Sequence, residues 1–369
     1  MTRSAPKFLA FIICLAFASL LHGAEQWSGV DRIVAIGDVH GDMDGFVATL
    51  RNAGLINRRN NWTGGATHLV QVGDIPDRGP DTREIVELMK KLQRQAENDG
   101  GMVHALIGNH EAMNMLGDLR YVHPGEYEAF RGRNSRQLRD NLYEVHLKEL
   151  RESVPILRLE SDHREQFNER YPLGYIEHRF AWAADGEIGS WVTQHNAVIR
   201  INRILFLHGG IGPEILGIPI AEINDRIRAE LSGEMGEEPG LSEMETGPLW
   251  YRGLAQNDAA TEAAHVDAVL EYYDVDHIVI GHTPGLATVV PRFGGKVILI
   301  DSGMSAYYGS HRASLEITNG EFITHQGEVE LPLPISNDPL LPYLETVAEM
   351  EDGVPALQRL IEQLRQAAP

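Results

Sequence analysis

An aspartate and a histidine two positions apart, Asp38 and His40, are the first residues of this sequence that could do chemistry together. They follow the apolar run 33–36 in the stretch GDVHGD. Gly37 and Gly41 on either side allow the tight bend that turns a carboxylate and an imidazole toward one metal ion. Alone, such a pair is ordinary for a loop between a strand and a helix.

The same pattern, an apolar run that ends in small residues beside Asp, Asn or His, recurs four times. The later segments are HLVQVGDIPDRG (68–79), MVHALIGNHE (102–111), RILFLHGG (203–210) and HIVIGHT (277–283). Because open α/β sheets bind ligands at the carboxyl ends of their strands, these endings predict one shared site. The candidate metal ligands are Asp38, His40, Asp74, Asn109, His208 and His282.

All six candidates offer nitrogen or oxygen and none offers sulfur, a donor set that suits manganese, iron or zinc. Six donors are too many for one catalytic ion with an open position, but they fit two ions that share a carboxylate. Two ions about 4 Å apart can hold a bridging hydroxide and clamp both oxygens of an in-line displacement. Phosphate ester hydrolysis most needs this arrangement. The expected cofactors are therefore two divalent metal ions, with manganese preferred and iron or zinc as alternatives.

Strand-like and helix-like segments alternate around these residues. Helices are predicted over 43–52, from Asp81 to an end within 98–101, over 218–231 and 261–273, and from Pro355 in the tail. In the second of these helices, Ile85, Leu88, Met89 and Leu92 recur on one face, which indicates a helix packed on the core. Further strands are expected at 296–300, 313–317 and 322–325. Strand, helix and strand in this rhythm predict parallel pairing with right-handed crossovers.

Between Met115 and Trp191 the pattern changes. Residues 126–152 are charged and predict one long helix, and residues 164–179 mix charges with aromatic side chains. We interpret about 118–190 as a mostly helical insertion beside or over the site, with its charges forming a solvated face. The histidines in this half have no ligand-like neighbours in sequence, and we assign them no chemistry: His104, His123, His146, His163, His178 and His195.

Composition limits the possible partners. A net charge of −21 argues against nucleic acid, because proteins that bind its backbone carry basic patches. A small anionic substrate is still compatible, since metal ions and a few arginines can supply positive charge locally. A hydrophobic content of 43% is enough for a substantial core.

The N-terminus has the order of a secretory signal. Arg3 and Lys7 precede the apolar run 8–21, which is short for a bilayer span. Residues 1–24 are therefore predicted to be a signal peptide, and the mature protein is expected in the periplasm or outside the cell without stable membrane association. An uncleaved anchor is the alternative, because a cut after Ala24 leaves His22 where a small residue is preferred.

The single cysteine, Cys14, lies inside that signal segment. The cleaved chain would contain no cysteine, so it would need no disulfide in an oxidising compartment. A cysteine nucleophile is excluded for the same reason.

The motifs GDVHG, GDIPDRG, GNHE, HGG and GHT, in this order, closely resemble those of PPP-type metallophosphatases of the calcineurin-like phosphoesterase superfamily. The resemblance covers about residues 33–310. It implies an α/β fold, namely a sandwich of β-sheets flanked by helices with a mostly helical insertion. On this basis we expect a catalytic domain over 25–335 and a helical tail over 336–369.

The resemblance also implies roles for individual residues. Asp38, His40 and Asp74 would hold the first metal ion; Asp74, Asn109, His208 and His282 would hold the second, with Asp74 bridging. His110 would be the general acid, oriented by Asp77. Arg78 and Arg252 would clamp the phosphate, since guanidinium groups match phosphoryl oxygens.

Several positions depart from the eukaryotic serine/threonine enzymes of this family. Pro76 stands where valine is usual, and Ile107 replaces the arginine expected before GNHE. The stretches GNHEAMNMLGDLRYV and DSGMSAYYG resemble instead the Shewanella-like branch of PPP phosphatases. These departures leave the metal chemistry unchanged but do not support a transfer of substrate preference from the eukaryotic enzymes.

The expected substrate is a phosphoprotein or phosphopeptide carrying phosphoserine, phosphothreonine or phosphotyrosine. Two alternatives follow from the same sequence. A nucleotide hydrolase, similar to the diadenosine tetraphosphate hydrolases, would share these motifs. The other alternative, from a different class, is a metal-dependent binding or sensor protein that has lost catalysis, although every proposed catalytic and ligand position is intact here.

Overall fold

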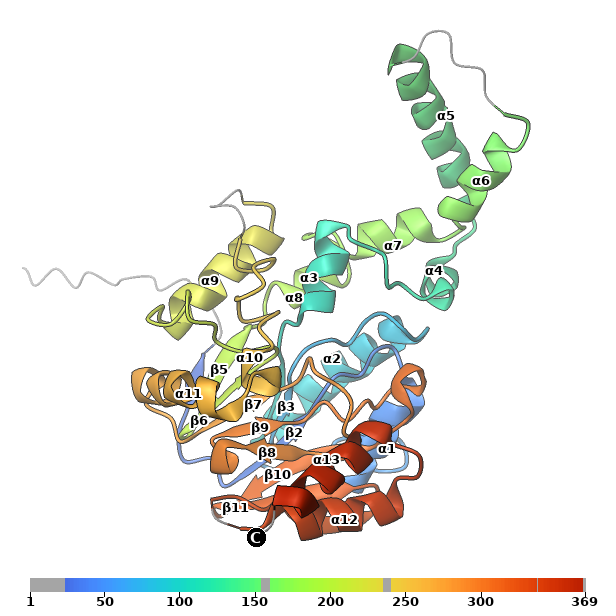
Figure 1. Ribbon diagram of the computed structural model, residues 1–369. Coiled ribbons are helices and arrows are strands. Elements are labelled where there is room, and N and C mark those ends of the chain that lie inside the picture. Colours follow the sequence, from blue (N-terminus) through green and yellow to red (C-terminus); the bar gives the residue numbers. More distant parts are fainter. Residues whose placement is uncertain (1–23, 154–159, 235–239, 337, 368–369) are drawn as a thin grey trace, which may run out of the picture.

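Two sheets of six strands form the centre of the molecule (Figure 1). The structure is a computed structural model that describes residues 24–153, 160–234, 240–336 and 338–367. One sheet has the order β12 (Val329–Pro332), β11 (Glu321–Gln326), β10 (Ala313–Thr318), β2 (Arg32–Ile36), β3 (His68–Gln71) and β4 (Met102–Ala105). The other has the order β1 (Gln26–Trp27), β5 (Val198–Ile201), β6 (Ile204–Leu207), β7 (His277–Ile280), β9 (Val297–Leu299) and β8 (Val290–Arg292).

The pairing register explains why the sequence motifs meet. Strands β2, β3 and β4 are parallel, and their last residues Ile36, Gln71 and Ala105 lie opposite one another. Strands β6, β7 and β9 are likewise parallel, with Leu207 opposite Ile280. The loops that follow these six strands therefore begin side by side at the carboxyl edge of each sheet. This parallel pairing is what the alternation of strands and helices predicted.

Both sheets contribute to one continuous hydrophobic core. Helix α1 (Met43–Asn52) begins at Asp42, whose carboxylate accepts a hydrogen bond from Gly45 N at 2.7 Å. Helix α2 (Thr82–Asn98) buries all four members of its predicted apolar stripe. Helices α9 (Ile220–Leu231) and α11 (Ala259–Tyr273) accompany the second sheet (Figure 1).

The predicted insertion is helical. It contains α4 (Pro124–Phe130), α5 (Ser135–Ser153), α6 (His163–Arg170), α7 (Tyr175–Ala181) and α8 (Gly189–Val192). Helices α5 and α6 form an arm that projects away from the sheets, whereas α4, α7 and α8 form its root (Figure 1). The expectation of one helix over 126–152 is wrong. The backbone is extended at Arg131, which ends α4. Helix α5 then begins at Ser135, whose hydroxyl accepts a hydrogen bond from Gly132 N at 2.8 Å.

The C-terminal part has more elements than the sequence predicted. Two helices follow the sheets, α12 (Leu340–Met350) and α13 (Pro355–Ala367), where the sequence indicated only the second. Strand β8 was also missed, because Pro291 lowers the strand signal. Its position at the edge of the sheet makes the missing N–H tolerable.

Across the described ranges, we find no helix long and apolar enough to cross a membrane. The predicted signal peptide lies outside the described residues except for Ala24.

Candidate active site

All six predicted metal ligands lie together at the carboxyl ends of the parallel strands. Each is at most 3% exposed, and each follows a different strand except the pair Asp38 and His40, which share the loop after β2. Asn109 starts the short helix α3 (Asn109–Leu116), which follows β4. Gly281 allows the two sheets to approach here, since a Cβ at this position would collide with the carboxylate of Asp38.

His208 presents an unprotonated nitrogen to the centre of this cluster. Its Nδ1 lies 3.0 Å from the carbonyl oxygen of Val72. Because a carbonyl only accepts, Nδ1 carries a proton, and in the neutral form of the ring the lone pair is then on Nε2. That Nε2 lies 2.9 Å from Asn109 Oδ1 and 3.2 Å from Asp74 Oδ2.

His282 is arranged in the same way from the other side. Its Nε2 lies 3.1 Å from the carbonyl oxygen of Trp250, so its lone pair is on Nδ1, 3.0 Å from His208 Nε2. Four acceptor atoms, from Asp74, Asn109, His208 and His282, thus converge with no proton between them. Ligands about 2.0–2.2 Å from one ion and at right angles are about 3 Å apart, so these residues fit a bound cation.

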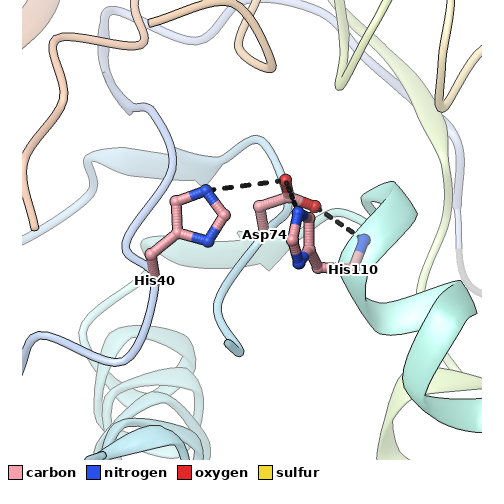
Figure 2. Close-up of side chains that lie close together, drawn as sticks. All are labelled: His40, Asp74 and His110. Atoms are coloured by element: carbon pink, nitrogen blue, oxygen red, sulfur yellow. Dashed lines mark hydrogen bonds and ion pairs between the residues drawn. The ribbon is translucent and has the colours of Figure 1, made fainter. Parts of the chain in front are cut away.

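A second group shares Asp74. The Nδ1 atom of His40 lies 3.1 Å from the carbonyl oxygen of Pro76, which leaves Nε2 free to face the carboxylates. This Nε2 lies 3.8 Å from an oxygen of Asp38 and 3.8 Å from Asp74 Oδ2. Figure 2 shows the rings of His40 and His110 close to each other, each joined by a dashed line to the carboxylate of Asp74. Two groups of side chains bring donor atoms within 4.8 Å of one another, namely His40, Asp74 and His110, and Asp74, His208 and His282. The donors around Asp74 therefore fit two cations that share this side chain.

Buried charges shift the pKa values in this cluster. Burial alone would raise the pKa of Asp74, but the positive charge that His208 and His110 carry when protonated holds it well below its usual range. Burial lowers the pKa of His40 to about 4. Both residues are therefore ready to bind a cation at neutral pH, one as a carboxylate and the other as a neutral imidazole.

His110 and Asp77 form a closely coupled pair beside the metal ligands. Asp77 Oδ2 lies 2.5 Å from His110 Nδ1, and the other oxygen accepts from Asn114 Nδ2 at 3.0 Å. His110 Nε2 lies 3.7 Å from Asp74 Oδ2. Burial would lower the pKa of His110, but the carboxylates of Asp74 and Asp77 raise it above its usual value. The geometry would allow this imidazole to bind a metal or to deliver a proton, and its carboxylate partner favours the second role.

The loop between β3 and α2 carries both Asp74 and Asp77, and its backbone is unusual. Asp74, Asp77 and Arg78 have φ values of 60°, 72° and 67°, a left-handed backbone conformation that residues other than glycine rarely adopt. Glu111 supports the first part of the loop, because its carboxylate accepts from Asp74 N at 2.9 Å and Ile75 N at 2.7 Å.

The two predicted phosphate-binding arginines lie at the edge of the cluster. Arg78 is stacked between two tyrosine rings, 3.9 Å from the centre of Tyr121 and 4.7 Å from that of Tyr307. Arg252 donates to the carbonyl oxygen of His282 and to Thr283 Oγ1, at 3.2 Å in the second case. The structure thus places Arg252 beside the metal ligands and Arg78 at the end of the loop that carries Asp77.

Two buried carboxylates at this site were not predicted from the sequence. Glu111 lies within the GNHE motif, yet its role in holding the neighbouring loop depends on tertiary contacts. Asp301 is buried after β9, and burial raises its pKa to about 6. Burial, and then the neighbouring carboxylate of Asp301, holds the pKa of Asp38 well above its usual range. The signal for Asp301 was present, since IDSG repeats the pattern of an apolar strand that ends in Asp and a small residue.

Comparison with known proteins finds a matching family model and similar relatives. The model of the calcineurin-like phosphoesterase family matches residues 31–286. The chain is 32% identical over 290 residues to Shewanella-like protein phosphatase 2 of Arabidopsis thaliana, covering 74% of this chain and 72% of that protein. It is 33% identical over 303 residues to an uncharacterised protein of Schizosaccharomyces pombe, with 78% of each chain covered.

A solved structure is similar over most of the fold. The cold-active protein-tyrosine phosphatase of a psychrophilic Shewanella species superposes with a TM-score of 0.65 at 30% sequence identity. The similar region covers 84% of this chain and 82% of that one.

Proposed function

Because the chain belongs to the calcineurin-like phosphoesterase family, we propose that it is a protein phosphatase that uses two divalent metal ions to hydrolyse phosphate monoesters on protein side chains. The observation that carries this proposal is the convergence of unprotonated donors around Asp74, directly beside the pair of His110 and Asp77. A site that only bound metal would not need the second feature. The alternative of a non-catalytic sensor leaves that pair without a purpose.

Different groups at the site have different roles in the proposed reaction. Bound divalent ions supply charge neutralisation for the phosphate and an activated water. As an imidazolium, His110 holds a proton at Nε2 for the departing oxygen, and Asp77 stabilises this cation through Nδ1 until the proton is given up. Arg252 and Arg78 provide guanidinium groups for the phosphoryl oxygens, which they can bind through two parallel hydrogen bonds.

Within this activity we propose phosphotyrosine as the preferred substrate. Aromatic rings lie beside the acid–base pair and its neighbour His40: the ring of Tyr121 lies 5.2 Å from that of His110, and that of Tyr308 lies 5.3 Å from that of His40. Tyr307 is 60% exposed beside Arg78. Such rings can pack on a phenyl leaving group but gain little from the short side chain of phosphoserine. The similar Shewanella enzyme is described as a tyrosine phosphatase.

The test is a substrate panel with metal-stripped protein. We expect chelation to abolish activity and manganese to restore more of it than magnesium, because histidine ligands favour a transition metal. Phosphotyrosine peptides should be hydrolysed faster than phosphoserine peptides, and both faster than diadenosine tetraphosphate. Preferred cleavage of the dinucleotide would overturn the protein phosphatase assignment in favour of a nucleotide hydrolase. Full turnover by metal-free protein would overturn the two-metal site.

We also propose that the protein is exported and that residues 1–24 are removed. The basic residues and apolar run at the N-terminus support this. N-terminal sequencing of protein recovered from the periplasm or medium tests it, with a first residue near Glu25 expected. Recovery of an uncut chain in the membrane fraction would instead support the anchor.

A further inference from the structure

A buried glutamate from the insertion holds the backbone of Asp77. Glu126, on α4, is 1% exposed, and its Oε1 accepts a hydrogen bond from Asp77 N at 2.9 Å. Its other oxygen lies 3.6 Å from Nε2 of His178, which is on α7 and fully buried. Glu126 thus contacts Asp77, and His178 lies beside Glu126. Both belong to a segment whose charges the sequence indicated as a solvated face.

We infer that Glu126 is a positioning residue for the general acid, and that the root of the insertion is therefore part of the catalytic apparatus. This inference rests on the proposed function. Glu126 does not touch the reacting atoms. It acts through Asp77, whose carboxylate fixes the ring of His110.

The backbone conformation shows why Asp77 needs this support. Asp77 and the next residue, Arg78, both have left-handed φ values, which non-glycine residues adopt only when their surroundings hold them. The N–H of Asp77 is buried, and Glu126 supplies its acceptor. The N–H of Arg78 is bound in turn by the carbonyl oxygen of Tyr121 at 3.1 Å. Both supports come from residues 118–130, just beyond α3.

The insertion also holds the other partner of the pair. Arg179 on α7 donates to the carbonyl oxygens of Asn114 and Met115 at the end of α3, the helix that carries His110. The side chain of Asn114 in turn donates to Asp77. Helices α4 and α7 thus contact Asp77 on one side and the helix of His110 on the other. They pack tightly on each other, since a Cβ at Gly174 would collide with the backbone of Tyr127.

A matched control exists in the same loop. Glu111 supports Asp74 and Ile75 in the way that Glu126 supports Asp77, but it belongs to the metal-binding half of the loop. Loss of Glu111 should therefore lower metal content. Loss of Glu126 should leave the metals in place and impair only proton delivery.

The experiment compares Glu126→Met with Glu126→Gln. Methionine keeps the buried volume but removes the acceptor, whereas glutamine keeps an oxygen that can accept from Asp77 N. We expect Glu126→Met to lower kcat about tenfold on a phosphotyrosine peptide and more on a phosphoserine peptide. It should have little effect on nitrophenyl phosphate, whose leaving group hardly needs a proton. KM and metal content should stay unchanged, and Glu126→Gln should remain within about twofold of the wild type.

A double-mutant cycle decides whether Glu126 acts through His110. In a His110→Asn background, Glu126→Met should cause no further loss, because the group that it positions is already absent. Equal losses on all substrates, loss of metal, or full additivity with His110→Asn would each overturn the inference. Should Glu126→Met fail to fold, Glu126→Asp makes the same test, since it withdraws the acceptor by one methylene. A wild-type protein that hydrolyses none of these substrates would contradict the proposed function itself, which is a different outcome from a uniform loss in an active enzyme.

Discussion

The loop between β3 and α2 has two halves that are held by different parts of the chain. Its first half carries Asp74 and is held by Glu111, a member of the GNHE motif. Its second half carries Asp77 and is held by Glu126 from the insertion. Metal binding therefore depends on strand ends and motifs of the sheet core. Proton delivery depends also on helices that the core does not supply, so the two capacities can be lost separately.

The largest effect is expected from Asp74→Asn, which removes the carboxylate shared by both groups of donors. Because the amide has no negative charge to offset two cations, we expect loss of metal and a fall in activity of more than about 10⁴-fold on every substrate. Metal analysis on the purified variant, with circular dichroism as a control for folding, checks this. Retention of two metal ions with near-normal turnover would show that Asp74 does not bridge.

His110→Asn tests the other half of the comparison. A general acid contributes about 10²–10⁴-fold in rate, but only where the leaving group needs a proton. The variant should keep its metals, lose most activity on phosphoserine peptides, lose less on phosphotyrosine and least on nitrophenyl phosphate. Measured kcat values for the three substrates give this series directly. If His110 is instead a metal ligand, metal content will fall and all three substrates will suffer alike.

Arg252→Ala should have a smaller effect, limited to phosphate binding. Charged hydrogen bonds to a ligand contribute about 1.5–3 kcal/mol, which corresponds to about 10–100-fold in kcat/KM. Inhibition by free phosphate should weaken by a similar factor. Arg252→Lys is the control, because it keeps the charge but not the two-pronged geometry. Since Arg252 also donates to the backbone of His282, metal content must be measured. Loss of metal from the Arg252→Ala variant would show that Arg252 supports metal binding rather than phosphate binding.

The smallest expected effect is on stability in acid, at the junction of the insertion and the sheets. Burial lowers the pKa of His195, just after α8, to about 4. The unfolded chain binds a proton near pH 6.5 and the folded protein does not, so the stabilisation is complete above pH 6.5 and is lost as the pH falls toward 4. At pH 5.5 we expect a loss of about 1.4 kcal/mol from this residue.

Urea unfolding of the metal-free protein at pH 7.5 and 5.5 measures this loss. The matched variant His195→Gln can still hydrogen-bond Gln93 but does not titrate, so its decrease in unfolding free energy should be smaller by about that amount. An identical decrease in both proteins would mean that His195 is accessible to protons in the folded state.

The sequence indicated that the six candidate ligands lie together because each follows an apolar strand directly. Asp38, His40 and Asp74 needed only local pattern and the parallel rhythm to be brought together. The same rule applies to Asp301, which follows the apolar strand β9 in the stretch IDSG. The supports of the loop could not be predicted in this way. Glu126 looks like one charge among many on a surface helix, and only the packing of α4 under Asp77 makes it a buried acceptor.

In the helical arm, the sequence predicted the type of secondary structure but not where the helices begin and end. Its helical character was evident from composition, but the break between α4 and α5 depends on local contacts of Arg131 and Ser135. That break separates the root, which contacts the site, from the arm, which does not (Figure 1).

The residues of the site with left-handed backbone conformations favour activity at the expense of folding stability. His40, Asp74, Asp77, Arg78 and His282 all have positive φ values, and each such residue costs about 1–2 kcal/mol relative to an unstrained backbone. Glycine at any of them would relieve the strain and remove the chemistry. A laboratory evolution campaign that selected only for thermal tolerance would therefore drift toward glycine at these positions and yield robust but inert proteins. Turnover must be part of the selection for these side chains to persist.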